Sequence, residues 1–581
     1  MLKSTYSENC ICARRSLSTI WTEVAVLIGS AFILSLAFPG FIFPEGLGFI
    51  AFFALIPVFA VIDNTSWKLT PFYGFLFGFT FYLFFNYWLK TFHALAIILV
   101  PVIKGAEMLL MFPCLKAASK WFGKRLGHWV QAMIWVAYAY MSQSWFAGYP
   151  YGTICYALYK YYILIQVADL TGIWFIIFMM IAPQAYLGSW LQGVYDSRKM
   201  GMQPEKLARR AAGSKASLIV YAVLFLFWVV YGIVSFSYWG KQESDMTWRI
   251  AAIQHNADSW KGGYTTYKRN FNNLRKMSLE ALTKNPDMII WSETAFVPSV
   301  SWHTNYPNPD SPETAELVKE FVEFGKSLPV PLVTGNPEGV LDSDDGSAYD
   351  DDGNWKRKDY NTVILFDDGA IKETYRKQQL VPFTEHFPYQ KQMPWLYNLL
   401  LANDYNWWEK GTESVVFETT QGVKFSTPIC YEDVFGKLCA DFVKNGADIL
   451  LNMTNDSWSG CTEAELQHAA IGVFRSVENR RTTVRSTNSG ISCMINPQGK
   501  IIDPMDPFRM YWHIYDVEVY TQSSHGTTVY TQYNDYLALI CKTAAFVLLA
   551  LGGAWYFIGY VQSGSTRTSA WLKKRLMPRQ K

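Results

Sequence analysis

The chain has 581 residues, of which 50% are hydrophobic and 17% are charged, whereas an average soluble domain is about 25% charged. The formal net charge of +3 is too small to indicate a nucleic-acid partner. Long apolar runs occupy residues 22–238 and 536–561, but residues 241–530 have the composition of an ordinary globular domain. The composition therefore excludes a wholly soluble protein and predicts one large soluble block between membrane segments.

Eight apolar segments are long enough to predict membrane helices, since a span needs roughly 20 mostly apolar residues. They are 22–39, 46–63, 71–89, 92–113, 128–146, 162–190, 217–238 and 536–561. Lys104 and Glu107 interrupt the fourth span; we interpret them as a pair that faces a cavity or the interface, with a functional intramembrane site as the alternative. We expect the first span to be retained, because another span follows it and no small-residue cleavage site is evident.

Clusters of Lys and Arg alternate along the predicted loops. They occur before the first span and after the second, fourth, sixth and eighth spans, while the other loops carry few. Because such clusters collect in cytoplasmic loops, both termini are predicted in the cytoplasm and the soluble block on the outer side. The predicted organisation is a cytoplasmic N-terminus (1–21), seven membrane helices (22–239), an extracytoplasmic domain (240–530), an eighth helix (531–562) and a basic cytoplasmic C-terminus (563–581).

The soluble block alternates short apolar runs with amphipathic stretches, which predicts an α/β layered domain. The predicted strands are 249–254, 287–293, 330–336, 361–367, 423–432, 447–455 and 491–497, and the predicted helices include 264–283, 312–327 and 462–480. The segment 341–359 is polar and is expected to be a loop. Calcium binding there is the alternative, but the segment lacks the ligand spacing and the closing glutamate. No cofactor or metal site is predicted, and no disulfide pairing follows from the nine cysteines.

Reactive side chains follow several of the predicted strands. Glu293 closes one strand, Cys430 closes another, and Lys377 and Glu385 lie in the segment YRKQQLVPFTEHFP. A cysteine nucleophile, a carboxylate base and a lysine that stabilises negative charge would suit acyl transfer. Each residue also has a simpler interpretation, as a core cysteine, a turn cap and a surface lysine, and their spacing alone does not bring them together.

Five segments resemble, in order and spacing, the motifs of the nitrilase (carbon–nitrogen hydrolase) superfamily. They are WSETAF, YRKQQLVPFTEHFP, ICYED, NMTNDSW and RSTNSGISCMINPQGKI, and the resemblance covers about residues 248–517. It implies an α-β-β-α sandwich with a Glu–Lys–Cys triad. In the membrane part, LAFPGF and FAGYPYG, together with LVPFTEHFP, resemble the apolipoprotein N-acyltransferase family.

This resemblance implies a role for each matching residue. Glu293 would be the general base, Lys377 the lysine that stabilises the oxyanion, Cys430 the nucleophile and Glu385 a supporting carboxylate. Four further residues are implied to shape the site or bind substrate: Tyr431, Glu432, Trp260 on a mobile arm over the substrate entrance, and Trp458. Thr384 and Ser459 depart from the family pattern, which leaves substrate preference open more than the reaction.

The implied activity is transfer of an acyl chain from a phospholipid, through a thioacyl-Cys430 intermediate, to the N-terminal amine of a diacylglyceryl-cysteine apolipoprotein. The implied location is a bacterial inner membrane, with the catalytic domain on the periplasmic side of a multi-pass monomer. One alternative is a membrane-tethered amidase or nitrilase that uses water as the acceptor. A second is a transporter with an outer binding module, for which the pair Lys104 and Glu107 is the main support.

Overall fold

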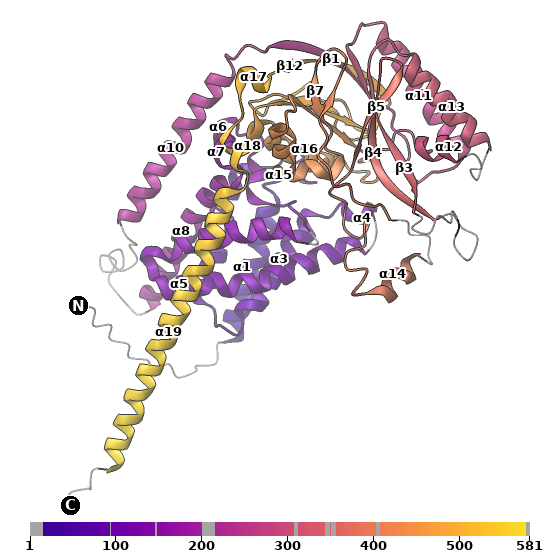
Figure 1. Ribbon diagram of the computed structural model, residues 1–581. Coiled ribbons are helices and arrows are strands. Elements are labelled where there is room, and N and C mark those ends of the chain that lie inside the picture. Colours follow the sequence, from indigo (N-terminus) through magenta and orange to yellow (C-terminus); the bar gives the residue numbers. More distant parts are fainter. Residues whose placement is uncertain are drawn as a thin grey trace, which may run out of the picture.

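The computed structural model describes residues 16–92, 95–145, 148–199, 215–306, 312–342, 349, 356–401 and 407–576. A group of apolar helices lies below an α/β domain, and α10 (Lys215–Trp239) and α19 (Tyr536–Leu576) run from this domain along the outside of the bundle (Figure 1). The helix α19 continues into the predicted C-terminal tail. Most of the predicted N-terminal segment, and most of the polar segment 341–359, lie outside the described residues.

Five of the described helices are long and apolar enough to cross a membrane. They are α1 (Leu17–Ser35), α5 (Ala96–Ser144), α8 (Trp174–Lys199, of which 174–195 qualifies), α10 and α19. Two shorter apolar helices, α2 (Ile56–Asn64) and α3 (Thr70–Phe85), pack among them. The chain is therefore a membrane protein with several candidate spans.

Gly123 divides α5 into two helices, because its φ of 63° interrupts the helical backbone. The side chain of Gln131 in the second half donates a hydrogen bond of 3.0 Å to the carbonyl of Leu115 in the first half. The two halves therefore lie side by side, and they coincide with the predicted spans 92–113 and 128–146. Between them the Lys104 ammonium lies 3.1 Å from the Glu107 carboxylate; the lysine is buried and the glutamate is partly buried.

The predicted span 162–190 starts too early. The structure has two short helices, α6 (Tyr162–Ile165) and α7 (Ala168–Thr171), before α8 begins at Trp174. The chain turns at Gly172, whose φ is 62° and where a Cβ atom would lie 2.5 Å from the Tyr530 ring. Apolar composition continues through this turn, so hydropathy alone does not reveal it.

The α/β domain contains two six-stranded sheets, each with parallel and antiparallel pairs. The strand orders are β12-β1-β2-β3-β4-β5 and β11-β10-β9-β8-β7-β6. The first sheet consists of β1 (Met246–Gln254), β2 (Met288–Ile290), β3 (Leu332–Leu341), β4 (Arg357–Asp367), β5 (Ala370–Arg376) and β12 (Tyr511–Val519). The second consists of β6 (Phe417–Glu418), β7 (Lys424–Ser426), β8 (Ile449–Thr454), β9 (Thr482–Thr487), β10 (Cys493–Ile495) and β11 (Ile501–Ile502).

Apolar side chains hold the layers together. Residues of both sheets, such as Ile250 and Val484, share one buried cluster, so the sheets pack face to face. On the other face of the first sheet lie α11 (Tyr264–Leu282) and α13 (Pro312–Ser327). Next to the second sheet lie α15 (Gly436–Lys444) and α16 (Thr462–Asn479). These layers place the ends of β2, β5, β7 and β8 near one another.

The α/β domain is docked onto the helices through buried polar contacts. Arg480, which is 1% exposed, donates from Nη2 to Asp169 Oδ2 at 2.6 Å and from Nη1 to Gln166 Oε1 at 2.7 Å. Trp88 Nε1 donates to Gln467 Oε1 at 2.9 Å. Because these groups are buried on both sides, the interface fixes how the two parts meet.

Candidate active site

Cys430 sits at the start of the short helix η3 (Cys430–Val434), shortly after β7, with a φ of 49°. A left-handed backbone at a residue other than glycine is strained and is common at functional sites. Ile429 bridges to Met453 in β8, and the Asn452 side chain donates to the carbonyl oxygens of Pro428 (3.1 Å) and Cys430 (3.3 Å). The second sheet therefore holds the partly buried thiol on a fixed turn.

Glu293 lies three residues after β2 and is buried among donors. Its Oε1 accepts hydrogen bonds from Asn361 Nδ2 (2.8 Å) and Lys377 Nζ (3.0 Å), and its Oε2 accepts from the backbone N–H of Asn455 (2.9 Å). Donors from three different segments of the chain thereby hold both carboxylate oxygens in place. Such a carboxylate can accept a proton without changing position.

Lys377 follows β5 and is fully buried between two carboxylates. Its ammonium lies 3.0 Å from Glu293 and 2.8 Å from Glu385. Glu385 is held in turn, because its second oxygen accepts a hydrogen bond of 2.8 Å from the backbone N–H of Val381. The predicted residues Glu293, Lys377 and Glu385 thus form one connected group.

The same group controls the charge of the thiol. Burial raises the pKa of Cys430 well above its usual value, Glu293 raises it further, and Lys377 opposes the rise. Burial also raises the pKa of Glu293, against the lowering effect of Lys377. Burial disfavours the charge of Lys377, but Glu293 and Glu385 outweigh it and hold its pKa well above the usual value. The resting thiol is therefore neutral and needs a base to become a nucleophile.

Glu432 is fully buried and connects the turn at Cys430 to the loop after Lys377. It accepts hydrogen bonds from the backbone N–H groups of Ile429 (2.8 Å), Gln378 (2.6 Å) and Gln379 (3.0 Å), and from the Tyr375 hydroxyl (2.9 Å). Burial raises its pKa to about 7. Because Glu432 bonds to the backbone on both sides, it holds the turn at Cys430 and the loop after Lys377 in fixed positions.

The three predicted aromatic residues lie on the side of the bundle. The Tyr431 hydroxyl donates to the Gly148 carbonyl, and the Tyr431 ring stacks on Tyr151 at 6.3 Å. The Trp458 ring lies 5.3 Å from Phe92, at the end of α4 (Leu89–Phe92). Trp260 is 66% exposed, and its ring lies 6.1 Å from the same Phe92. Trp260 and Trp458 therefore meet at one phenylalanine of the membrane part.

Sequence reasoning missed a buried charge cluster behind the thiol. His468 on α16 lies between Asp433 (2.9 Å) and Asp456 (3.1 Å), and Arg485 on β9 also pairs with Asp433. Ser459, one of the departures from the family pattern, bonds Glu465 beside this cluster. Two polar residues in buried segments could have revealed this cluster: the arginine within the strand TTVRST and the histidine on an apolar helix face.

The cluster predicts a pH dependence of stability. Burial opposes charge on His468, but Asp433 and Asp456 outweigh it and raise its pKa to about 9. In the unfolded chain the pKa of a histidine is about 6.5, so the charged His468 stabilises the fold fully below pH 6.5. This contribution is on the order of 3 kcal/mol. This contribution is lost as pH rises from 6.5 through 9.

Thermal unfolding of the full chain between pH 6 and 10 measures this effect. The parent should lose stability over this interval more steeply than His468→Gln does. His513, which is only partly buried, is changed to Gln as the matched control and should keep the parent's slope. Equal slopes for the parent and His468→Gln would show that the imidazole is uncharged in the fold.

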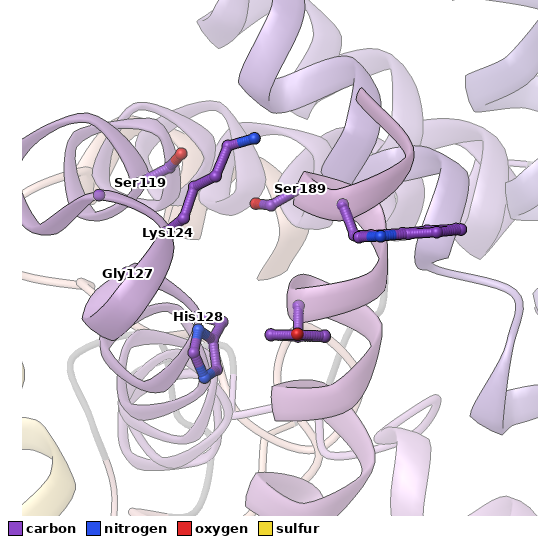
Figure 2. A pocket seen from close by; sticks show the side chains of 8 residues that line it. Ser119, Lys124, Gly127, His128 and Ser189 are labelled. Carbon is purple, nitrogen blue, oxygen red and sulfur yellow. The ribbon is translucent and has the colours of Figure 1, made fainter. Parts of the chain in front are cut away.

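The structure contains a small pocket inside the helical bundle. Figure 2 shows the side chains of Ser119, Lys124, His128 and Ser189 around it, with Gly127 on the adjoining turn. Its volume of about 10 Å³ is enough for roughly one water molecule. None of the predicted site residues lines it, so it is not a candidate for the substrate. Across the described residues, no group of three or more His, Cys, Asp or Glu side chains is suited to a metal ion.

Comparison with known proteins identifies both parts of the chain. Residues 249–519 match the carbon–nitrogen hydrolase family, and residues 30–185 match the apolipoprotein N-acyltransferase N-terminal domain. Apolipoprotein N-acyltransferase 1 of Treponema denticola is 34% identical over 518 residues, which cover 88% of this chain and 92% of that protein. Apolipoprotein N-acyltransferase 1 of Treponema pallidum is 33% identical over 545 residues, which cover 91% and 95%. With two family domains and relatives that match nearly end to end, the chain belongs to the apolipoprotein N-acyltransferase family of membrane enzymes and carries a nitrilase-like domain.

Proposed function

We propose that this protein moves an acyl chain from a phospholipid to the N-terminal amine of a diacylglyceryl-cysteine apolipoprotein, through a thioester on Cys430. The observation that carries the proposal is the buried position of Lys377 between Glu293 and Glu385. In addition, Glu293 raises the pKa of Cys430 and Lys377 lowers it. In this arrangement Glu293 is the base, Lys377 the oxyanion stabiliser, and Glu385 the group that orients the lysine.

In the first step, the Cys430 sulfur attacks the carbonyl carbon of the phospholipid ester while Glu293 takes the thiol proton. Lys377 and nearby backbone N–H groups stabilise the resulting oxyanion. When the tetrahedral intermediate collapses, the carbon–oxygen bond breaks and Glu293 returns the proton to the leaving lysophospholipid. A neutral resting thiol fits this step, since proton transfer accompanies the attack.

In the second step, the lipoprotein amine attacks the thioester carbonyl and Glu293 accepts the amine proton. The carbon–sulfur bond then breaks, and the proton returns to Cys430 as an amide is released. Trp260 and Trp458 lie against Phe92 of the membrane part, and these ring contacts support a role in contacting lipid chains at the entrance. We propose these roles for them, with Tyr431 and Glu432 shaping the turn beside the thiol.

We propose eight spans and an outer, periplasmic catalytic domain in a bacterial inner membrane. The division of α5 at Gly123 turns five long helices into six spans, and α2 and α3, although short, coincide with predicted spans. The alternating Lys and Arg clusters support the orientation. The proposed organisation has membrane helices within 22–239 and 531–562, an α-β-β-α sandwich at 240–530, and a monomer without a cofactor.

The alternative acceptor is water, which would make the enzyme a membrane-tethered amidase or nitrilase with the same triad. A single experiment separates the two reactions. The purified protein is incubated with phospholipid labelled in its acyl chain, and the peptides are then analysed by mass spectrometry with and without a diacylglyceryl lipopeptide. We expect label on the Cys430 peptide, and its transfer to the lipopeptide amine. Absence of any acyl adduct would contradict the thioester, and release of only free fatty acid would favour water.

A further inference from the structure

Two segments of the active site meet one buried histidine of α16. His468 lies with Nε2 2.9 Å from Asp433 Oδ1 and with Nδ1 3.1 Å from Asp456 Oδ1. Asp433 belongs to η3, the turn that begins at Cys430. Asp456 directly follows the residue whose backbone N–H donates to Glu293 at 2.9 Å. The imidazole therefore connects the turn of the proposed nucleophile to the loop that orients the proposed base.

The contacts of His468 require a charged imidazole. An ionised carboxylate only accepts hydrogen bonds, so a ring nitrogen that faces one must carry a proton. Here each of the two ring nitrogens faces a carboxylate. Arg485, which is also buried, pairs with Asp433 and lies 3.8 Å from Asp456. Two negative and two positive side chains therefore balance one another within the buried cluster.

The other polar groups around this cluster add no charge. Burial and the neighbouring Asp456 raise the pKa of Glu465, one turn earlier on α16, well above its usual value, so this carboxyl is neutral at pH 7. Burial raises the pKa of the Cys493 thiol to about 12. On the side of the bundle, the ring of Tyr151 lies 6.0 Å from the imidazole. The balance of charge therefore depends on His468.

This balance bears on the thiol. Burial and Glu293 raise the pKa of Cys430 the most, and Asp456 raises it further. A carboxylate near a thiol disfavours the thiolate, and a cation paired with that carboxylate reduces the effect. The imidazolium can therefore influence the thiol through Asp456.

We propose that His468 is a positioning residue of the acyl-transfer reaction, whose positive charge holds Asp433 and Asp456 together and cancels the negative charge behind Cys430. It acts through the two aspartates and not on the substrate. The inference deepens the proposed function and rests on it in one respect, because it takes Cys430 as the nucleophile. Without the imidazolium the cluster would keep one uncompensated negative charge, and the thiol would be harder to ionise.

Alkylation of Cys430 measures this effect without any lipid. The full-length protein in detergent micelles is treated with iodoacetamide between pH 6 and 10, and mass spectrometry follows the peptide that contains residue 430. We expect His468→Gln to slow alkylation at pH 7 by about tenfold, the change that corresponds to a rise of one unit in the thiol pKa. The difference should shrink above pH 9, because the pKa of His468 is about 9 and the parent's imidazole then also loses its charge.

Asp456→Asn separates compensation of charge from a loss of structure. Added to His468→Gln, it removes the uncompensated charge, so alkylation should return to within about threefold of the parent rate. A purely structural role predicts instead that the double variant is at least as slow as the slower single variant. That result, or alkylation of His468→Gln at the parent rate, overturns the proposal.

Two controls accompany the series. His513→Gln changes a partly buried histidine of the same domain and should be alkylated at Cys430 as the parent is. Alkylation of the fully buried Cys439 reports folding and should stay slow in every variant. If His468→Gln exposes Cys439, Asp456→Asn alone decides, since it must be alkylated at least as fast as the parent and a slower rate overturns the proposal. Because alkylation needs neither lipid nor acceptor, this experiment and the thioester assay can fail separately.

Discussion

Cys430→Ala is expected to abolish the acyl adduct and to lower transfer to the lipopeptide by on the order of 10⁴-fold or more. Without the sulfur, the remaining Glu293 and Lys377 can orient a carbonyl but cannot form the thioester. The substitution changes little else, because alanine keeps the Cβ atom and the left-handed backbone at φ 49°. Rates of lipopeptide acylation and the mass of the peptide that contains residue 430 measure the effect.

Cys439→Ala is the matched control, since Cys439 is a fully buried cysteine of the same domain on α15. It should lower stability through the small cavity that it creates, yet retain the adduct. The proposed nucleophile is wrong if Cys430→Ala still carries acyl label while it keeps the parent's unfolding temperature.

Glu293→Gln is expected to lower the rate of adduct formation by about 10²- to 10⁴-fold, the usual contribution of a general base. An amide cannot accept the thiol proton. Its NH₂ group must also face a donor, because Glu293 receives Lys377 and Asn361 on one oxygen and the Asn455 N–H on the other. Some loss of stability is therefore expected as well.

The pH profile separates these two effects. In the parent, adduct formation should fall at low pH as Glu293 becomes protonated, at a pKa that burial raises above the usual carboxyl value. In Glu293→Gln this fall should disappear, whereas the exposed Glu323→Gln on α13 should keep it. If Glu293→Gln still shows the parent's fall in adduct formation at low pH, another group is the base.

The sequence predicts the family and the residues of the candidate site because their motifs are local. WSETAF and ICYED each place one reactive side chain a few residues after a strand, and the two sheets bring these strand ends together. The hydrogen bonds of Lys377 to two carboxylates follow from the long-range fold. The order of the motifs alone does not predict these hydrogen bonds; only the resemblance to the family implies that the residues meet.

Features that depend on partners far along the chain were not predictable. His468 looks like an ordinary polar residue of a helix until Asp433 and Asp456 approach it from two loops. The turn at Gly172 is likewise invisible to hydropathy, because its cause is the Tyr530 ring more than 350 residues away. In both cases the deciding interaction joins segments that no sequence window contains.

The buried contacts of Arg480 have a practical consequence for anyone who wishes to work with the catalytic domain alone. A fragment cut at residues 240 and 530 would lose Asp169 and Gln166 and expose a guanidinium that the full chain buries. It would also free the Tyr431 hydroxyl, next to the thiol, from the Gly148 carbonyl. The membrane part therefore supplies hydrogen-bond partners that the catalytic domain needs around its own active site. Studies of Cys430 chemistry should use the full chain in detergent or lipid.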